Sequence, residues 1–377
     1  MVQLGESYYF PDAAKYDSFA QDILHLRTGG VPTASITPGY PIFLSIIYLV
    51  FGHNILAVQI IQAVMGGGIC LLIYLLARKA FNEKVGVIAL SISAIYPTLI
   101  FYSGALISEY LFTFLIALAL FMILKFYEKP STTTALLSGG ILGFAILTRS
   151  VLVFYPLFVV VLIVFLKRGY FVNTLGKLFI MFFATCMVIL PWTIRNYKIF
   201  HEFIPLSTIG GYVFYVSNHP KADGTAYDAY DTNKDIEESD RETVSMLNEV
   251  DLDRYYYKKA FGNIKNDPLL MLRLMPKKFL RFWALYPHTT TLHKIISILS
   301  FGLLLPFALF GLIYSIYHNR SSPVFLMFSI ILYMTLINST LFYGSTRFRF
   351  PIEPYLIIFA SYGLIEFKSK LSRWIGN

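Results

Sequence analysis

The chain has 377 residues, of which 56% are hydrophobic and only 14% are charged. Soluble domains carry about 25% charged residues, so this composition excludes an ordinary soluble enzyme and predicts an all-α polytopic membrane protein. The net charge of +9 is then expected to reflect topology and contact with membrane lipids, and no nucleic acid partner is expected. Both cysteines, Cys70 and Cys186, lie in apolar segments, so neither a disulfide nor a cysteine metal site is expected.

Residues 1–53 precede the long apolar segments and are predicted to form an ordered loop at the membrane surface. Apolar residues recur at helical spacing over 12–26, with Asp12 near the N-cap. The rigid turn 37–41 follows. The apolar run 42–51 is too short to span, so it is expected to lie at the interface or to pack against the bundle.

About nine apolar segments have the length of membrane-spanning helices. Their expected ranges are 54–77, 84–102, 106–125, 133–148, 151–166, 178–194, 294–317, 323–342 and 352–367. Lys and Arg fall in alternate short loops and at the C-terminal end, which the positive-inside rule assigns to the cytoplasm. We therefore expect four parts: the loop 1–53, a bundle over 54–194, an outer insertion over 195–293, and the last spans with a cytoplasmic tail over 294–377.

This topology places residue 1 outside the cell with no helix before it. We expect a first transmembrane helix upstream, missing through truncation or a misassigned start. The alternative is a first helix that inserts with its N-terminus outside.

The insertion is expected to divide in two. The acidic stretch 228–240 indicates a solvated loop, although its carboxylates could hold a divalent cation. The stretch 241–285 is predicted to be helical in pieces, broken at Pro268 and Pro276. Its basic, aromatic residues 277–283 are typical of an amphipathic segment at lipid headgroups.

The same orientation gathers ionisable residues on the outer side of the membrane. These are Asp12, Glu109, Arg149, Arg195, Arg347 and Arg349. Charged groups at membrane level are costly, so such a cluster predicts a functional site. For any single arginine, contact with lipid headgroups is the alternative.

Several motifs carry a resemblance to a known family. In chain order they are Asp12-x-x-Lys15-Tyr16-Asp17, Pro38-Gly39-Tyr40-Pro41, Ser108-Glu109, Thr148-Arg149, Pro191-Trp192-x-x-Arg195-Asn196 and Arg347-Phe348-Arg349-Phe350-Pro351-x-x-Pro354. Together they resemble the bacterial branch of glycosyltransferase family 39, the protein O-mannosyltransferase and aminoarabinose transferase group. The resemblance implies the C-type glycosyltransferase fold.

The resemblance also implies roles for individual residues. Asp12 holds the first place of the family's acidic pair and would be the catalytic base; the second place is Ala13, a departure that leaves Asp17 as a competitor. Glu109 matches the acid of the second outer loop. Candidates for the donor phosphate are Lys15, Arg149, Arg195, Arg347 and Arg349, and candidates for support of the acceptor or the loop are Tyr16, Tyr40 and Asn196.

The chemistry of glycosyl transfer requires such a set. Cationic groups stabilise a departing polyprenyl phosphate, a carboxylate takes the acceptor's proton, and a single in-line carboxylate predicts inversion. The expected partners are a polyprenyl-phosphate-linked sugar, membrane lipids and an acceptor that is a protein, a lipid or a glycan. No cofactor is expected, and the site would face outward from the cytoplasmic membrane. The alternatives are a transporter or flippase, or a ligase that uses a diphosphate-linked glycan.

Overall fold

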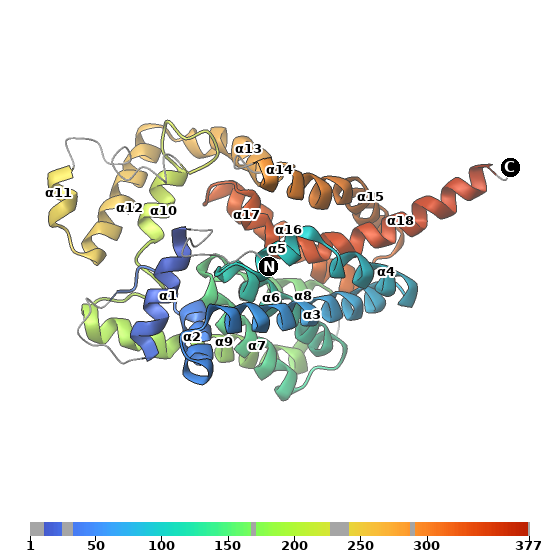
Figure 1. The fold of residues 1–377 in the computed structure, drawn as a ribbon, viewed down its shortest axis with the longest axis horizontal. Coiled ribbons are helices and arrows are strands. Elements are labelled where there is room, and N and C mark those ends of the chain that lie inside the picture. Colours follow the sequence, from blue (N-terminus) through green and yellow to red (C-terminus); the bar gives the residue numbers. More distant parts are fainter. Residues whose placement is uncertain (1–10, 25–32, 167–170, 227–240, 287–290, 376–377) are drawn as a thin grey trace.

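The computed structural model describes residues 11–24, 33–166, 171–226, 241–286 and 291–375, and all regular secondary structure within them is helical. Most of the helices lie side by side along the long axis of the molecule, as Figure 1 shows. Helices α1, α10, α11 and α12 gather toward one end, and the last turns of α18 project at the other. The all-α architecture predicted from composition is confirmed.

Six helical stretches in the described residues are long and apolar enough to cross a membrane. The first three are α3 (Ile55–Ala80), α6 (Ser108–Glu128) and the part Thr174–Phe200 of α9 (Phe171–Phe200). The fourth is Lys294–His318, which includes the end of α14 (Thr291–Ser297), η3 (Ile298–Gly302) and α15 (Leu303–His318), and the fifth is α16 (Ser322–Thr340). The sixth is Thr346–Arg373, which includes α17 (Thr346–Arg349), η4 (Phe350–Ile352) and most of α18 (Glu353–Ile375). A seventh results if α4 (Glu83–Ala94) and α5 (Pro97–Ser103), which are bent by 52°, form one span.

The two remaining expected spans are helical but short. They are α7 (Thr132–Thr148) and the stretch Ser150–Leu166, which contains η1 (Ser150–Leu152) and α8 (Tyr155–Leu166). A spanning helix needs about 20 residues, and α7 has 17. The polytopic membrane class is thus confirmed, while the expected count of nine spans is not.

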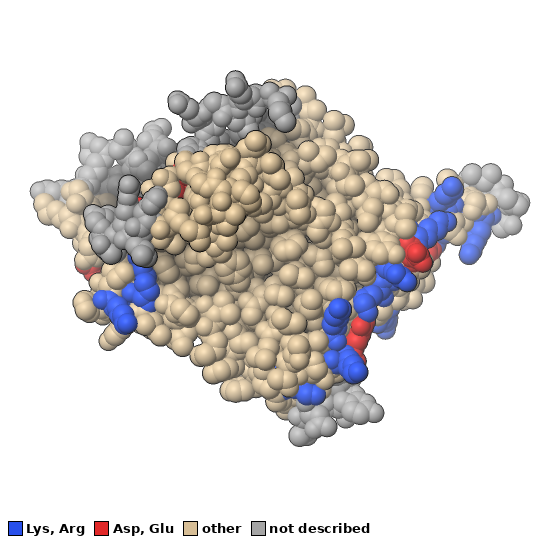
Figure 2. Space-filling view, turned by 60° about the horizontal axis from the view of Figure 1, so that its bottom comes forward, with Lys and Arg blue, Asp and Glu red and all other residues tan. Residues whose placement is uncertain are grey.

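The helix ends that were expected on one side of the membrane do meet in the fold. Lys79 at the end of α3 pairs with Glu128 at the end of α6 at 2.7 Å, and the Asn319 side-chain amide donates to the Ala80 carbonyl at 2.9 Å. Figure 2 shows Lys and Arg gathered at the edge of the molecule nearest the C-terminal helix, beside a broad face with few charges. We call this the basic end, and the opposite end, which carries the insertion, the site end.

Close helix contacts hold the bundle together. A side chain at Gly139 of α7 would collide with the Met181 carbonyl of α9, and one at Gly311 of α15 would collide with the Phe359 carbonyl of α18. Small residues allow membrane helices to approach in this way, since van der Waals packing drives their association.

Helices α1 (Pro11–Leu24) and α2 (Gly39–Phe51) cover part of the site end. Helix α2 buries Tyr40, Leu44 and Tyr48 against the bundle and leaves Leu49 and Phe51 exposed. The expectation of a short apolar segment that packs against the bundle is therefore confirmed.

The insertion contains α10 (Gly210–Ser217), α11 (Arg241–Met246), α12 (Glu249–Asn266) and α13 (Leu270–Phe282). The expected break at Pro268 is present, but the expected break at Pro276 is wrong, because Pro276 lies inside α13. Proline removes one helical hydrogen bond and frees the carbonyl four residues earlier, here that of Leu272, but α13 continues past Pro276 to Phe282.

Candidate functional site

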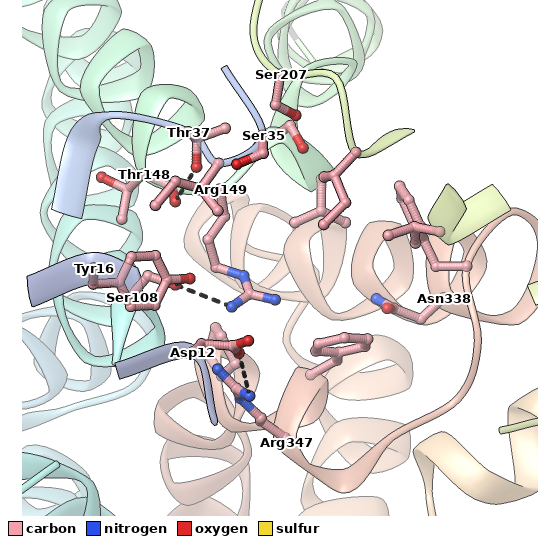
Figure 3. A pocket seen from close by; sticks show the side chains of 18 of the residues that line it. Asp12, Tyr16, Ser35, Thr37, Ser108, Thr148, Arg149, Ser207, Asn338 and Arg347 are labelled. Carbon is pink, nitrogen blue, oxygen red and sulfur yellow. Dashed lines mark hydrogen bonds and ion pairs between the residues drawn. The ribbon is translucent and has the colours of Figure 1, made fainter. Parts of the chain in front are cut away.

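A cavity of about 240 Å³ opens at the site end. Its wall brings together residues far apart in the chain: Asp12, Lys15, Tyr16, Ser35, Ile36, Thr37, Ser108, Thr148, Arg149, Ser150, Val151, Ser207, Ile209, Val213, Met334, Asn338, Phe342, Tyr343, Arg347, Phe348 and Pro351. Figure 3 shows the guanidinium groups of Arg149 and Arg347 entering from opposite sides, with Asp12 beside Arg347. Of the sequence-predicted candidates, this cavity unites Asp12, Lys15, Tyr16, Arg149 and Arg347.

Glu109 lies beneath this cluster in the first turn of α6 and is fully buried. Its Oε1 accepts from Arg149 Nη1 at 2.6 Å and from Arg347 Nε. The N-terminal turn of a helix also favours a negative charge. A buried carboxylate is tolerated only with such partners, so Glu109 fixes the two guanidinium groups relative to each other.

Arg347 bridges two carboxylates. Its Nε contacts Glu109, and its Nη1 lies 2.8 Å from Asp12 Oδ2. The side chain of Asp12 is 44% exposed, whereas that of Arg347 is 20% exposed. The accessible carboxylate is therefore Asp12 of α1, and its ion-pair partner Arg347 is held in place by the buried Glu109.

Arg149 enters the cavity at the C-cap of α7. Its Nη1 donates to Ser108 Oγ at 3.2 Å, and the guanidinium lies 5.2 Å from the ring centroid of Phe348. The hydroxyl of Tyr16 is 3.1 Å from the same Ser108 oxygen. Burial raises the pKa of Tyr16, so this hydroxyl keeps its proton and remains available for hydrogen bonding.

The turn that opens α2 fits against the end of α7. Thr37 Oγ1 donates to the Thr148 carbonyl at 2.9 Å, which satisfies an acceptor that a helix end leaves unpaired. A Cβ on Gly39 would lie 2.6 Å from the Thr148 backbone nitrogen. Glycine at position 39 is thus required for α2 to approach the residue that precedes Arg149.

Arg349 does not line the cavity. Its side chain is 2% exposed, pairs with Glu353 at 3.1 Å and donates to the carbonyls of Phe282 and Ala284. It joins α17 to α18 and to the end of α13. Its contacts are those of a structural arginine.

Arg195 and Asn196 also lie outside the cavity wall. Arg195 Nη1 donates to the Thr33 carbonyl and to Asn196 Oδ1, both at 3.0 Å, and the Asn196 amide donates to the Ile204 carbonyl at 3.0 Å. These contacts hold the first loop and the chain after α9 in place, which fits the support role that was expected of Asn196.

Asp17 and Tyr40 are buried beside the cavity without lining it. Tyr40 donates to Gln62 Oε1 at 2.9 Å, and Asp17 contacts Tyr48 and His53. Ala13, which stands at the second place of the family's acidic pair, is 2% exposed within the hydrophobic core. A small, buried residue thus stands at the position where the resemblance implies an acidic one.

Sequence reasoning missed the neutral polar part of the wall. Ser35 and Thr37 reach the cavity from the loop before α2, Ser207 from the loop after α9, and Asn338 from α16. Only Asn338 carried a usable signal, because a polar residue inside an apolar helix marks a functional position more often than chance. The serines and threonines are too common in loops to stand out.

The charges at the site favour an anion. Lys15, Arg149 and Arg347 supply three positive charges and Asp12 and Glu109 two negative ones, which leaves one positive charge in excess. The described residues contain no group of three or more His, Cys, Asp and Glu side chains able to hold a metal ion. The expected absence of a cofactor stays a prediction, and the acidic stretch 228–240 lies outside the described residues.

Comparison with known proteins gives a family match and several structural matches. A model for the dolichyl-phosphate-mannose-protein mannosyltransferase family matches residues 35–193. No curated protein sequence matches the chain. The fold resembles the oligosaccharyltransferase AglB from Archaeoglobus fulgidus in complex with an inhibitory peptide and a dolichol-phosphate, with a TM-score of 0.57, 16% identity and 98% of this chain covered.

A second similar structure is ArnT from Cupriavidus metallidurans bound to undecaprenyl phosphate, with a TM-score of 0.54, 13% identity and 94% of this chain covered. The chain spans about half the length of these proteins, 49% of AglB and 56% of ArnT. These matches confirm the resemblance indicated by the sequence motifs and the fold that it implies.

Proposed function

We propose that this chain, a multi-pass membrane protein with the C-type glycosyltransferase fold, transfers a sugar from a polyprenyl-monophosphate carrier to an acceptor at the outer face of the cytoplasmic membrane. The observation that carries the proposal is the linked set Asp12, Arg347, Glu109 and Arg149 at the cavity. It joins an accessible carboxylate to two anchored guanidinium groups, as glycosyl transfer from a lipid phosphate requires.

The cationic groups suit the leaving group. A sugar joined to a polyprenyl phosphate is a phosphodiester with one negative charge. When the bond to the sugar breaks, the polyprenyl phosphate leaves as a monoester with two negative charges. Arg149 and Arg347 lie at fixed positions around Glu109, and Lys15 lines the same cavity. Preorganised cations of this kind stabilise charge that develops in the transition state.

Donor binding would also free the base. In the structure Asp12 occupies Arg347 Nη1, while Glu109 holds Nε. A donor phosphate drawn to Arg347 replaces Asp12 at Nη1, and Glu109 keeps the guanidinium in place. The released Asp12 carboxylate then takes the proton of the acceptor hydroxyl.

The acceptor oxygen forms a bond to the anomeric carbon as the bond from that carbon to the phosphate oxygen breaks. The electron pair of the broken bond leaves with the phosphate. One carboxylate that activates the attacking group on the face opposite the leaving group gives inversion, as in inverting glycosidases.

The comparisons support the donor class. The AglB structure was determined with a dolichol-phosphate and the ArnT structure with undecaprenyl phosphate. The matching family is described by transfer from a dolichyl-phosphate sugar to protein. At 16% and 13% identity, these structures share the fold with this chain. We therefore infer its donor and its acceptor from the chemistry of the cavity.

The test is transfer of radiolabelled sugar by the purified chain in lipid vesicles. The donors are polyprenyl-monophosphate sugars, a polyprenyl-diphosphate glycan and a nucleotide sugar, and the product's anomeric configuration is determined by NMR. We expect an inverted product from a monophosphate donor alone. Transfer only from the diphosphate glycan would support the ligase alternative, and movement of lipid-linked glycan across the vesicle membrane without transfer would support a transporter.

A further inference from the structure

Helix α1 carries two carboxylates with different surroundings. Asp12 and Tyr16 lie four residues apart, share one face of the helix and line the cavity. Asp17 lies one residue further, about 100° round the helix, and is 5% exposed. The second carboxylate therefore belongs to the interface between α1 and its neighbours.

The contacts of the Asp17 carboxylate include the side chains of Tyr48, Gln21 and His53. The Tyr48 hydroxyl donates to Oδ1 at 2.5 Å, and Gln21 Nε2 donates to Oδ2 at 3.0 Å. His53 Nε2 lies 2.9 Å from Oδ1 and 3.1 Å from Oδ2. Because a carboxylate oxygen accepts, a hydrogen bond from His53 to Asp17 requires the tautomer with a proton on Nε2, and Gln21 Nε2, which lies 3.3 Å from the same nitrogen, then donates to Asp17 alone.

Tyr48 and His53 belong to the fixed part of the site end. Tyr48 is 2% exposed in α2, and its ring lies 4.8 Å from the His53 ring in an edge-on arrangement. His53 follows Gly52, whose φ of 69° permits the turn after α2, and precedes Asn54, which caps α3. Asp17 thus contacts both α2, through Tyr48, and the short link between α2 and α3, through His53.

Apolar contacts also hold α1 in place. Ala13 and Ala20 are buried, and the ring of Phe19 lies 6.1 Å from that of Trp192. Apolar contacts of this kind keep the helix docked but do not fix its rotation, because they are not directional. Directional contacts come from Asp12 and Tyr16 on the cavity side of α1 and from the hydrogen bonds of Asp17 on the side toward Tyr48 of α2.

We infer that Asp17 is a positioning residue: together with Tyr48 and His53 it fixes the rotation of α1 and so the place of Asp12 opposite Arg347. The inference rests on the proposed function, in which Asp12 is the base. It gives Asp17 a role without substrate contact, in place of the catalytic role that the sequence left open.

The first test uses Tyr48→Phe, which removes one hydroxyl from the Asp17 carboxylate and leaves the cavity wall unchanged. The matched control is Tyr155→Phe. Tyr155 is also a buried tyrosine, its hydroxyl lies 2.9 Å from Ser329 Oγ, and it does not line the cavity. We expect kcat to fall about tenfold in Tyr48→Phe, as small misplacements of catalytic groups do, with KM for the donor and the thermal midpoint equal to those of the control. Full activity in Tyr48→Phe together with complete loss in Asp17→Asn would make Asp17 the base and overturn the inference.

The second test needs no activity, so it separates this inference from the proposed function. Nitroxide labels are placed at Ala14→Cys on α1 and Leu56→Cys on α3, both exposed positions, after Cys70 and Cys186 are replaced by alanine. We expect a narrow distance distribution by pulsed electron paramagnetic resonance, broadened by Tyr48→Phe and unchanged by Tyr155→Phe. Identical distributions in the two variants would contradict the inference, whatever the transfer assay gives.

Discussion

At the scale of single residues, Arg347 and Arg349 show what the sequence could and could not predict. Both were expected at the donor phosphate, yet only Arg347 lines the cavity. Residues two apart on a helix point to different sides, and in this structure Arg349 pairs with Glu353 instead of lining the cavity. Which arginine faces the cavity depends on packing of α17 against α13 and α18, and hydropathy and charge placement carry no information about that packing.

Glu109→Gln should destabilise the protein and abolish transfer, because it removes the buried carboxylate that Arg149 and Arg347 share. Loss of one partner of a fully buried ion pair costs about 3–5 kcal/mol, and we expect less here because the two arginine side chains are 19% and 20% exposed. The control is Glu128→Gln, since Glu128 is 44% exposed and pairs with Lys79 at the basic end. Thermal midpoints in detergent measure the difference, and equal midpoints in the two variants would contradict the assignment.

Arg347→Lys should lower kcat at least about 100-fold, because one ammonium cannot reproduce the fork that contacts Asp12 and Glu109 together. The control is Arg281→Lys, which alters a guanidinium paired with the exposed Asp223 and should retain activity. Kinetics with a saturating donor distinguish the variants. Wild-type turnover in Arg347→Lys would exclude a bidentate role.

At the scale of elements, the insertion is fixed to the α16–α17 turn. The fully buried Lys278 of α13 donates to Asn218 Oδ1 at 2.8 Å and to the Thr340 carbonyl at 2.9 Å. The Gly344 amide donates to the Gly224 carbonyl at 2.8 Å. These contacts position the turn that brings Phe342 and Tyr343 to the cavity. The sequence indicated a surface anchor for α13, since a buried lysine is not visible in an amphipathic pattern.

Burial lowers the pKa of Lys278 to about 8, and this predicts a pH dependence. The unfolded chain keeps this proton to about pH 10.4, so between pH 8 and 10.4 the unfolded state binds more protons and stability rises with pH. Lys278→Met should lack this rise, and wild type should gain about 2 kcal/mol relative to the variant across that window. Thermal unfolding at the two pH values, with the exposed Lys277→Met as control, checks the sign; a relative loss for wild type would contradict it.

At the scale of the whole molecule, hydropathy predicted the helices well, because the bilayer sets their length and their apolar character. The expected count of nine spans is not confirmed, since α7 and the stretch from Ser150 to Leu166 are apolar but short. The sidedness of charges brought together Asp12, Glu109, Arg149 and Arg347, which do meet at the cavity, but also Arg195 and Arg349, which lie outside its wall. The neutral wall from Ser35, Ser207 and Asn338 depends on how distant loops fold together, and a single sequence does not contain that information.

The excess of one positive charge at the site predicts inhibition by the released carrier. Polyprenyl phosphate should compete with the donor, and the uncharged polyprenol of the same length should not, because the proposed function assigns the phosphate, and not the chain, to Arg149 and Arg347 at the cavity wall. Initial rates at several donor concentrations give the mode of inhibition. Equal inhibition by the two lipids would place recognition in the tail and count against a phosphate site.

The central claim is that Asp12 is the base of a glycosyl transfer at this cavity, and its most direct test compares Asp12→Asn with Asp251→Asn. Each aspartate lies in the first turn of a helix, with side-chain exposure of 44% and 48%, beside an arginine. Both variants are reconstituted at equal amounts, and transfer of labelled sugar from a polyprenyl-monophosphate donor is measured. We predict that kcat falls by about 100-fold or more in Asp12→Asn and is unchanged in Asp251→Asn. Wild-type transfer by a folded Asp12→Asn variant would contradict the claim.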